Sequence, residues 1–113
     1  MSTITKEFLS GSTNGRGIKI AATATAGTQL HLAHASAKDE VFLWVTNTDA
    51  VERKVTVELG GVTAPDDNLI MNIPAGETLL VVPGLVLSGA VNAKAFGSAA
   101  NVLVAFGFVN RIS

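Results

Sequence analysis

The chain has 113 residues, enough for one domain with one hydrophobic core; 48% of them are hydrophobic and 15% are charged. An average soluble domain has about 25% charged residues, so this chain has little charge with which to cover itself as a monomer. The net charge of −1 and the scattered Lys and Arg residues argue against a nucleic-acid partner, and the lack of cysteine excludes disulfides.

Residues 1–17 contain no recognisable signal peptide and are mainly Ser, Thr, Gly and Asn around one apolar pair, Phe8-Leu9. Such a segment buries too little surface to offset the entropy of ordering it. We therefore expect a flexible arm over residues 1–17 and one β domain over residues 18–113. In this arm, Phe8 and Leu9 are candidate anchors on a neighbouring chain and Arg16 is a candidate charge contact; a tail without any such contact is the alternative.

From residue 18 onward, short β-type runs are separated by turn residues such as Gly60-Gly61 and Pro83-Gly84. The clearest run is 53–59, in which apolar and polar residues alternate strictly. The predicted strands cover residues 18–25, 28–33, 41–48, 53–59, 69–73, 77–82, 85–87, 91–96 and 101–112. About eight short strands at this spacing are typical of an all-β, antiparallel β-sandwich or jelly roll.

Several predicted strands are apolar on both faces, most clearly those at 41–48, 79–82 and 102–109. An antiparallel sheet with one face in water should alternate apolar and polar residues instead. We infer that one outer face is covered, by a loop or by another subunit, and we favour a subunit. The alternative is that Ala and Gly positions simply tolerate exposure, since much of any protein surface is apolar.

Few residues suggest chemistry. His31 and His34 are three residues apart, which places them on opposite faces of a strand. If the strand ends at Ala33 the two rings could converge, with Asp39 or Glu40 beside them. We interpret both as ordinary edge or loop histidines, and we predict no metal site, no cofactor and no catalytic residue.

Other polar patterns also have simple structural explanations. The turn at residues 66–68 lacks the spaced acidic ligands of a calcium loop, and the glycines between residues 11 and 17 lack a phosphate-binding pattern. Trp44 lies between Leu43 and Val45, which favours a place in the core or at an interface over sugar stacking. A monomeric glycan- or ligand-binding module remains an alternative.

The carboxy-terminal half contains the segments NLIMNIPAGETLLVVPGLVL (68–87), VNAKAFGSAAN (91–101) and GFVNRI (107–112). Over about residues 28–113 the sequence resembles small virion proteins of tailed bacteriophages, in particular the capsid cement (decoration) proteins. The resemblance implies a β-sandwich or jelly-roll homotrimer that binds the major capsid protein on the capsid exterior, after synthesis in the host cytoplasm. It also implies no enzymatic activity and no small-molecule substrate; a phage tail, neck or fibre component is the related alternative.

The apolar strands and the arm together supply our candidate interface side chains. These are Phe8, Leu9, Arg16, Phe42, Trp44, Phe106 and Phe108. The residues cannot be assigned to a particular partner from the sequence, because the expected function depends on broad surfaces and not on a motif.

Overall fold

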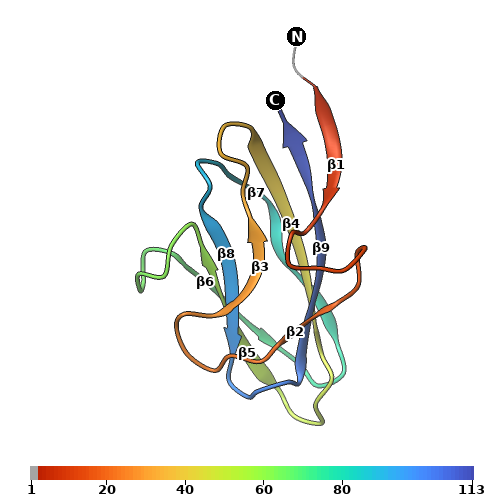
Figure 1. Ribbon diagram of the computed structural model, residues 1–113. Helices are drawn as coiled ribbons and strands as arrows, with labels where there is room; N and C mark the ends of the chain where they lie inside the picture. Colours follow the sequence, from red (N-terminus) through yellow and green to blue (C-terminus); the bar gives the residue numbers. More distant parts are fainter. Residues whose placement is uncertain (1–2) are drawn as a thin grey trace.

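Alternating apolar residues fold this chain into two antiparallel sheets that face each other, as the computed structural model of residues 3–113 shows (Figure 1). The strands are β1 (Ile4–Phe8), β2 (Ile18–Ile20), β3 (Thr28–Leu32), β4 (Lys38–Asn47), β5 (Arg53–Leu59), β6 (Asn68–Ile73), β7 (Thr78–Leu87), β8 (Asn92–Gly97) and β9 (Leu103–Ile112). The predicted all-β, sandwich-like class is confirmed, whereas the jelly-roll connectivity stays a prediction. Within residues 3–113 no helix has the length and apolar character needed to cross a membrane.

Sheet A has the strand order β1–β9–β4–β7, and β2 pairs with β9 beyond the end of β1. Sheet B has the order β3–β8–β5–β6. Every pairing in both sheets is antiparallel. The outermost strands are therefore β1, β2 and β7 in sheet A, and β3 and β6 in sheet B.

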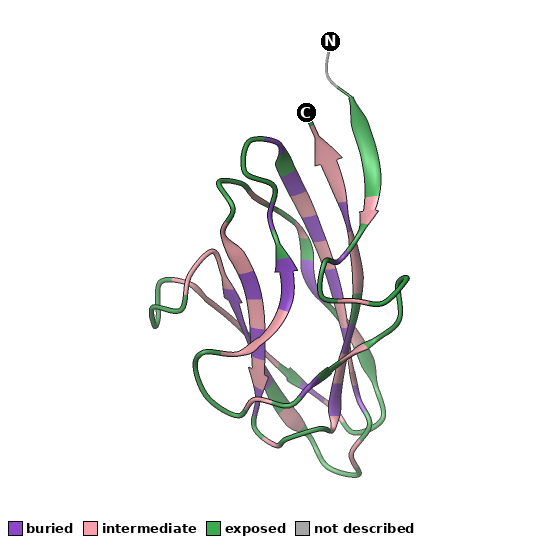
Figure 2. Cartoon of the chain, viewed as in Figure 1, coloured by how far each residue is buried: buried purple, intermediate pink, exposed green. Residues whose placement is uncertain are grey.

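The core lies between the two sheets and is built from aliphatic side chains. In β4, Val41, Leu43 and Val45 are fully buried while their neighbours are only partly buried, which produces the stripes along β4 in Figure 2. β8 has the same alternation. The fully buried core residues include Ile20, Leu30, Val41, Leu43, Val45, Val55, Val57, Ile73, Leu103, Ala105 and Val109.

Two predicted strand boundaries are wrong for reasons that involve neighbouring strands. The strands expected at 77–82 and 85–87 are one strand, because Pro83-Gly84 continues β7 as an irregularity and does not make a turn. An edge strand tolerates proline, which lacks a ladder donor, and Gly84 supplies a positive φ of 86°. The strand expected at 18–25 stops at Ile20, since the following residues leave sheet A and cross to sheet B.

The flexible arm predicted for residues 1–17 is not confirmed. β1 pairs with β9 along its whole length, from Ile4 opposite Ile112 to Phe8 opposite Phe108, and Leu9 is only 1% exposed within the core. The composition argument treated the segment in isolation, whereas the free edge of β9 provides the backbone partners that order it. Residues 1 and 2 of the predicted arm lie outside the described residues.

Candidate functional site

The outer face of sheet A carries most of the candidate interface residues. Because side chains alternate along a strand, β4 directs Phe42 and Trp44 outward while its aliphatic residues face the core. The register of β9 places Phe108 opposite Phe42 and Phe106 opposite Trp44. β1 adds Phe8, directly opposite Phe108. On the other side of β4, Leu80 of β7 lies opposite Trp44. We call this set the aromatic face: Phe8, Phe42, Trp44, Leu80, Phe106 and Phe108.

Three rings at the centre of the aromatic face stack on one another. The centroids of Phe42 and Phe108 are 5.0 Å apart with an interplanar angle of 16°. The Trp44 ring lies 6.2 Å from Phe108, and the Lys6 ammonium lies 4.9 Å from the centroid of the Phe108 ring. Offset stacking and a cation over a ring are both favourable, so these side chains form an ordered platform.

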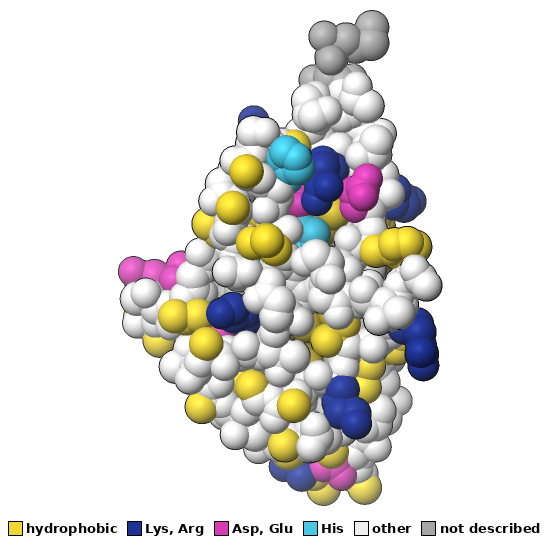
Figure 3. Space-filling model, in the orientation of Figure 1, with side chains coloured by type: hydrophobic (Ala, Val, Ile, Leu, Met, Phe, Trp, Pro, Cys, Tyr) yellow, Lys and Arg dark blue, Asp and Glu magenta, His cyan; other side chains and the backbone are white. Residues whose placement is uncertain are grey.

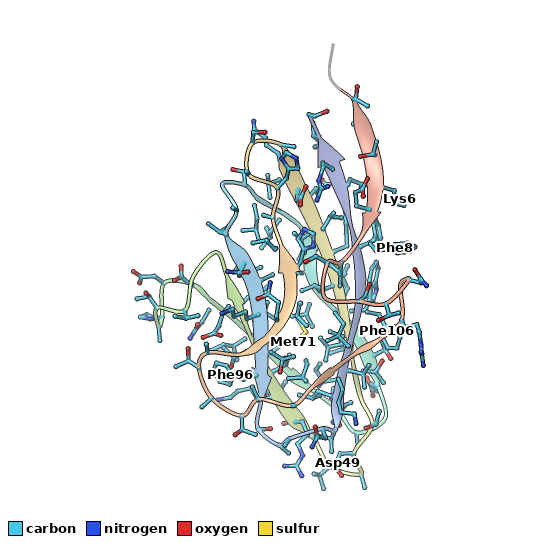
Figure 4. All side chains as sticks on the ribbon, in the orientation of Figure 1. Lys6, Phe8, Asp49, Met71, Phe96 and Phe106 are labelled. Atoms are coloured by element: carbon cyan, nitrogen blue, oxygen red, sulfur yellow. The ribbon has the colours of Figure 1, made fainter. Side chains whose placement is uncertain are left out.

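The rim of this platform is open. Phe8 is 61% exposed, Phe106 is 42% exposed and Leu80 is 40% exposed. Figure 4 shows Phe8 and Phe106 on the same outer side of the sandwich, with Lys6 above them. A contiguous exposed apolar patch on a soluble domain usually marks a surface that contacts another molecule.

The outer face of sheet B differs, because a loop covers part of it and hydrogen-bonds the one carboxylate buried there, that of Glu58. Residues 21–27 cross over β8, where a Cβ on Gly27 would lie 2.5 Å from the backbone of Ala95. Glu58 of β5 is fully buried and accepts hydrogen bonds from the Thr25 hydroxyl and the Gly27 amide. A loop therefore covers part of the outer face of sheet B, whereas the aromatic face of sheet A keeps exposed side chains such as Phe8 and Phe106.

A buried polar network at one end of the sandwich joins three strands. His31 of β3 and Asp39 of β4 are both fully buried, and the Nε2 of His31 lies 2.7 Å from the Oδ2 of Asp39. Arg111 of β9 donates from its Nε to the Oδ1 of Asp39 at 2.8 Å and from its Nη2 to the Oδ2 at 3.1 Å. Figure 3 shows histidine, basic and acidic side chains gathered at this end of the visible face.

Opposing effects act on the Asp39 carboxyl. Burial by itself would raise its pKa. Hydrogen bonds from Arg111, from the His31 ring and from the backbone of His34 favour the charged form more strongly. Together with the charge of Arg111, they lower the pKa of Asp39 from 3.8 to about 2. Asp39 is therefore an ionised, fully bonded structural group at neutral pH.

Both histidines lie where the sequence places them, His34 on a loop and His31 on the edge strand β3, but the His31 ring is fully buried and is not an ordinary edge side chain. His34 is exposed, and its Nδ1 accepts hydrogen bonds from the amides of Ser36 and Ala37. His31 instead enters the core, because β3 ends at Leu32 and the chain turns back so that Asp39 meets its ring. Both ring nitrogens of His31 are occupied, since Nδ1 accepts from the Ser10 amide.

The other sequence-predicted residues fall in different places. Leu9 belongs to the core, so it cannot anchor on a neighbour while it stays folded there. Arg16 is exposed on the loop between β1 and β2, and it lines a surface hollow that Phe106 also lines. Leu80 in the aromatic face and Lys6 over the Phe108 ring were not among the predicted interface residues. The period-2 spacing of Lys6 and Phe8 would have shown this only if residues 4–8 had been identified as a strand.

The described residues offer little for metal or catalytic chemistry. Among residues 3–113 no group of three or more His, Cys, Asp or Glu side chains is placed to hold a metal ion. The Asp67 carboxylate stabilises its own turn, since it accepts a hydrogen bond from the Thr63 amide. Comparison with protein-family models, curated protein sequences and solved structures found no match.

Proposed function

We propose that this protein is a non-enzymatic structural protein that self-associates through the aromatic face and acts as a capsid cement (decoration) protein on the exterior of a phage head. The observation that carries the proposal is the exposed, ordered set of aromatic side chains on sheet A. The sequence resemblance supplies the virion setting, with the major capsid protein as partner. In this proposal the sandwich is a jelly roll and the assembly is a homotrimer.

The dimensions of sheet A suit contact with a second copy. Three strands of ten residues, β9, β4 and β7, and a fourth row formed by the shorter β1 and β2, are spaced about 4.8 Å apart and present a flat area of roughly 600 Å². A stable interface buries about 800 Å² of accessible surface on each partner, and rough side chains expose more than the flat area. Contact with a second copy would cover most of this face, and closed symmetry would limit further growth.

Cement function requires several contacts that are weak individually. A trimer that binds neighbouring capsomers at several points gains avidity through effective concentration, so that each contact can be small. A rigid sandwich can hold neighbouring capsomers together mechanically, and this role needs no catalytic group. We therefore expect the protein to stabilise heads against the pressure of packaged DNA.

Light scattering across dilution to sub-micromolar concentration tests the self-association. We expect a mass three times that of the 11.6 kDa chain, and we expect Phe106→Lys to reduce it to that of a monomer. The matched control is Ile70→Lys, because Ile70 is 54% exposed but lies on sheet B. A wild-type monomer, or equal effects of the two variants, would contradict the proposal.

Copy number and head binding test the virion role. We expect the wild-type protein to co-sediment with phage heads that lack it, at hundreds of copies for each head. A handful of copies would favour a tail, neck or fibre component. Quenching of Trp44 fluorescence by a glycan or small ligand, in a monomer, would favour a binding module instead.

A further inference from the structure

The turn that follows β1 is held against β3 by three hydrogen bonds, and one of them is accepted by the His31 ring. The Ser10 amide donates to the Nδ1 of His31 at 3.0 Å. Beside it, the Leu32 amide donates to the Ser10 hydroxyl at 2.7 Å and the Gly11 amide donates to the Leu30 carbonyl at 2.9 Å. These contacts hold the turn that follows β1 against β3.

The hydrogen bonds define which nitrogen of His31 carries the proton. A backbone amide can only donate, so the Nδ1 that faces Ser10 must present a lone pair. The proton of the neutral ring is then on Nε2, which donates to Asp39. The contact with Ser10 therefore requires a neutral imidazole in one tautomer.

We propose that His31 is a pH-sensitive latch, and that protonation of its Nδ1 detaches the Ser10 amide and loosens the turn that follows β1. An imidazolium has a proton on both nitrogens. Rotating the ring therefore cannot restore an acceptor, and two N–H donors face each other across the present 3.0 Å contact. The Ser10 amide loses its partner, and the turn after β1 must move.

Charged groups face the ring from two other strands. Asp39 on β4 accepts the hydrogen bond from its Nε2, and Arg111 on β9 binds both oxygens of that carboxylate. Glu7 on β1 acts on Arg111. His34, at the end of β3, is exposed and contributes its amide to Asp39. Moving the turn away from β3 relieves the donor–donor contact while the bond from His31 to Asp39 is kept.

The loosened turn adjoins the assembly surface. Leu9 stays in the core and β1 stays paired with β9. Phe8, which is 61% exposed on the aromatic face and lies two residues before Ser10, would lose the fixed turn beside it. Because the loosened form binds one more proton, the latch weakens as the pH falls.

Amide hydrogen exchange in the His34→Gln variant tests the latch, because His31 is then the only histidine. Between pH 8 and pH 5, the range in which histidines ordinarily titrate, we expect protection of the Ser10 and Leu32 amides to fall by roughly tenfold or more, after correction for the intrinsic exchange rate. Protection of the Leu43 amide in the core should stay constant. The ¹⁵N shifts of the His31 ring should titrate with the same midpoint.

Three results would overturn the latch. These are constant protection at Ser10, an equal loss of protection at Leu43, and a His31 ring whose shifts do not change over this range. In His31→Gln, whose side-chain oxygen can accept from Ser10 without titrating, we expect pH-independent protection. If that variant does not fold, the measurements on His34→Gln decide the question alone.

Discussion

Asp39 shows how one buried charge can organise the end of this sandwich. It lies at the start of β4 and receives hydrogen bonds from β3, β9 and the intervening loop. An unpaired buried carboxylate would be strongly destabilising, so the ion pair and the hydrogen bonds must form together. Together these bonds fix the ends of β3, β4 and β9 relative to one another. Non-directional apolar contacts alone would not do so.

This charge predicts a loss of stability in acid. The pKa of Asp39 is about 2 when folded, below its ordinary value of 3.8, so its contribution is complete above about pH 4 and is lost as the pH falls through 2. The contribution is about 2 kcal/mol of unfolding free energy. Urea unfolding at pH 7, 4 and 2 should show this loss in the wild type. In Asp39→Asn, stability should be lower at pH 7 and flatter with pH.

Asp49→Asn is the matched control, since Asp49 pairs with Arg53 at the surface and exposed pairs contribute little. If both variants have the same acid profile, Asp39 is not the group responsible.

Gly107 marks the closest approach of β9 to β4. A Cβ at this position would lie 2.0 Å from the carbonyl oxygen of Phe42, a backbone atom that cannot move without disturbing the sheet. We expect Gly107→Ala to lower the unfolding free energy by roughly 2 kcal/mol or more, measured by urea denaturation. In Gly61→Ala the nearest atom is the flexible Asp67 carboxylate, so a similar loss there would contradict this account.

At the scale of the element, β4 has two different faces with two different roles. Leu43 is fully buried in the core, whereas Thr46 faces outward and shares a hydrogen bond with Thr78. Leu43→Ala should lower the unfolding free energy by about 3 kcal/mol through the cavity it leaves. Thr46→Ala should change it by less than about 1 kcal/mol. Equal losses in thermal or urea unfolding would mean that the inward and outward faces of β4 are not distinct.

β1 shows where reasoning from single elements fails. Four of its five residues are exposed and Glu7 is partly buried. The segment therefore has no buried apolar side that would identify it as a strand from its own sequence. The segment is ordered by its register with β9, more than ninety residues later in the sequence.

At the scale of the whole molecule, the asymmetry between the two sheets predicts how association should respond to salt. The aromatic face is apolar except for groups such as Lys6 and Glu40 near one end. We expect the dissociation constant, measured by light scattering or sedimentation, to change less than about threefold between 0.05 and 1 M NaCl, because screening acts mainly on exposed charges. Sodium sulfate should strengthen association. A steep weakening in NaCl would indicate an interface built from charges instead.

The sequence by itself was sufficient for the class of the fold and the positions of most strands. Both follow from an alternation of two residues that any sheet must obey, as β4 illustrates. It was also sufficient to predict that an apolar face is left over, because both faces of the strands at 41–48 and 102–109 are apolar.

Only the tertiary structure decided the rest, because the deciding contacts join residues far apart in the chain. The edge of β9 orders residues 4–8, and the meeting of β3, β4 and β9 buries the ring of His31, although this residue lies on an edge strand as expected. The path of residues 21–27 over sheet B leaves the aromatic face of sheet A open. Local sequence patterns carry no information about these pairings, since the free energy of each depends on a partner that the local sequence does not contain.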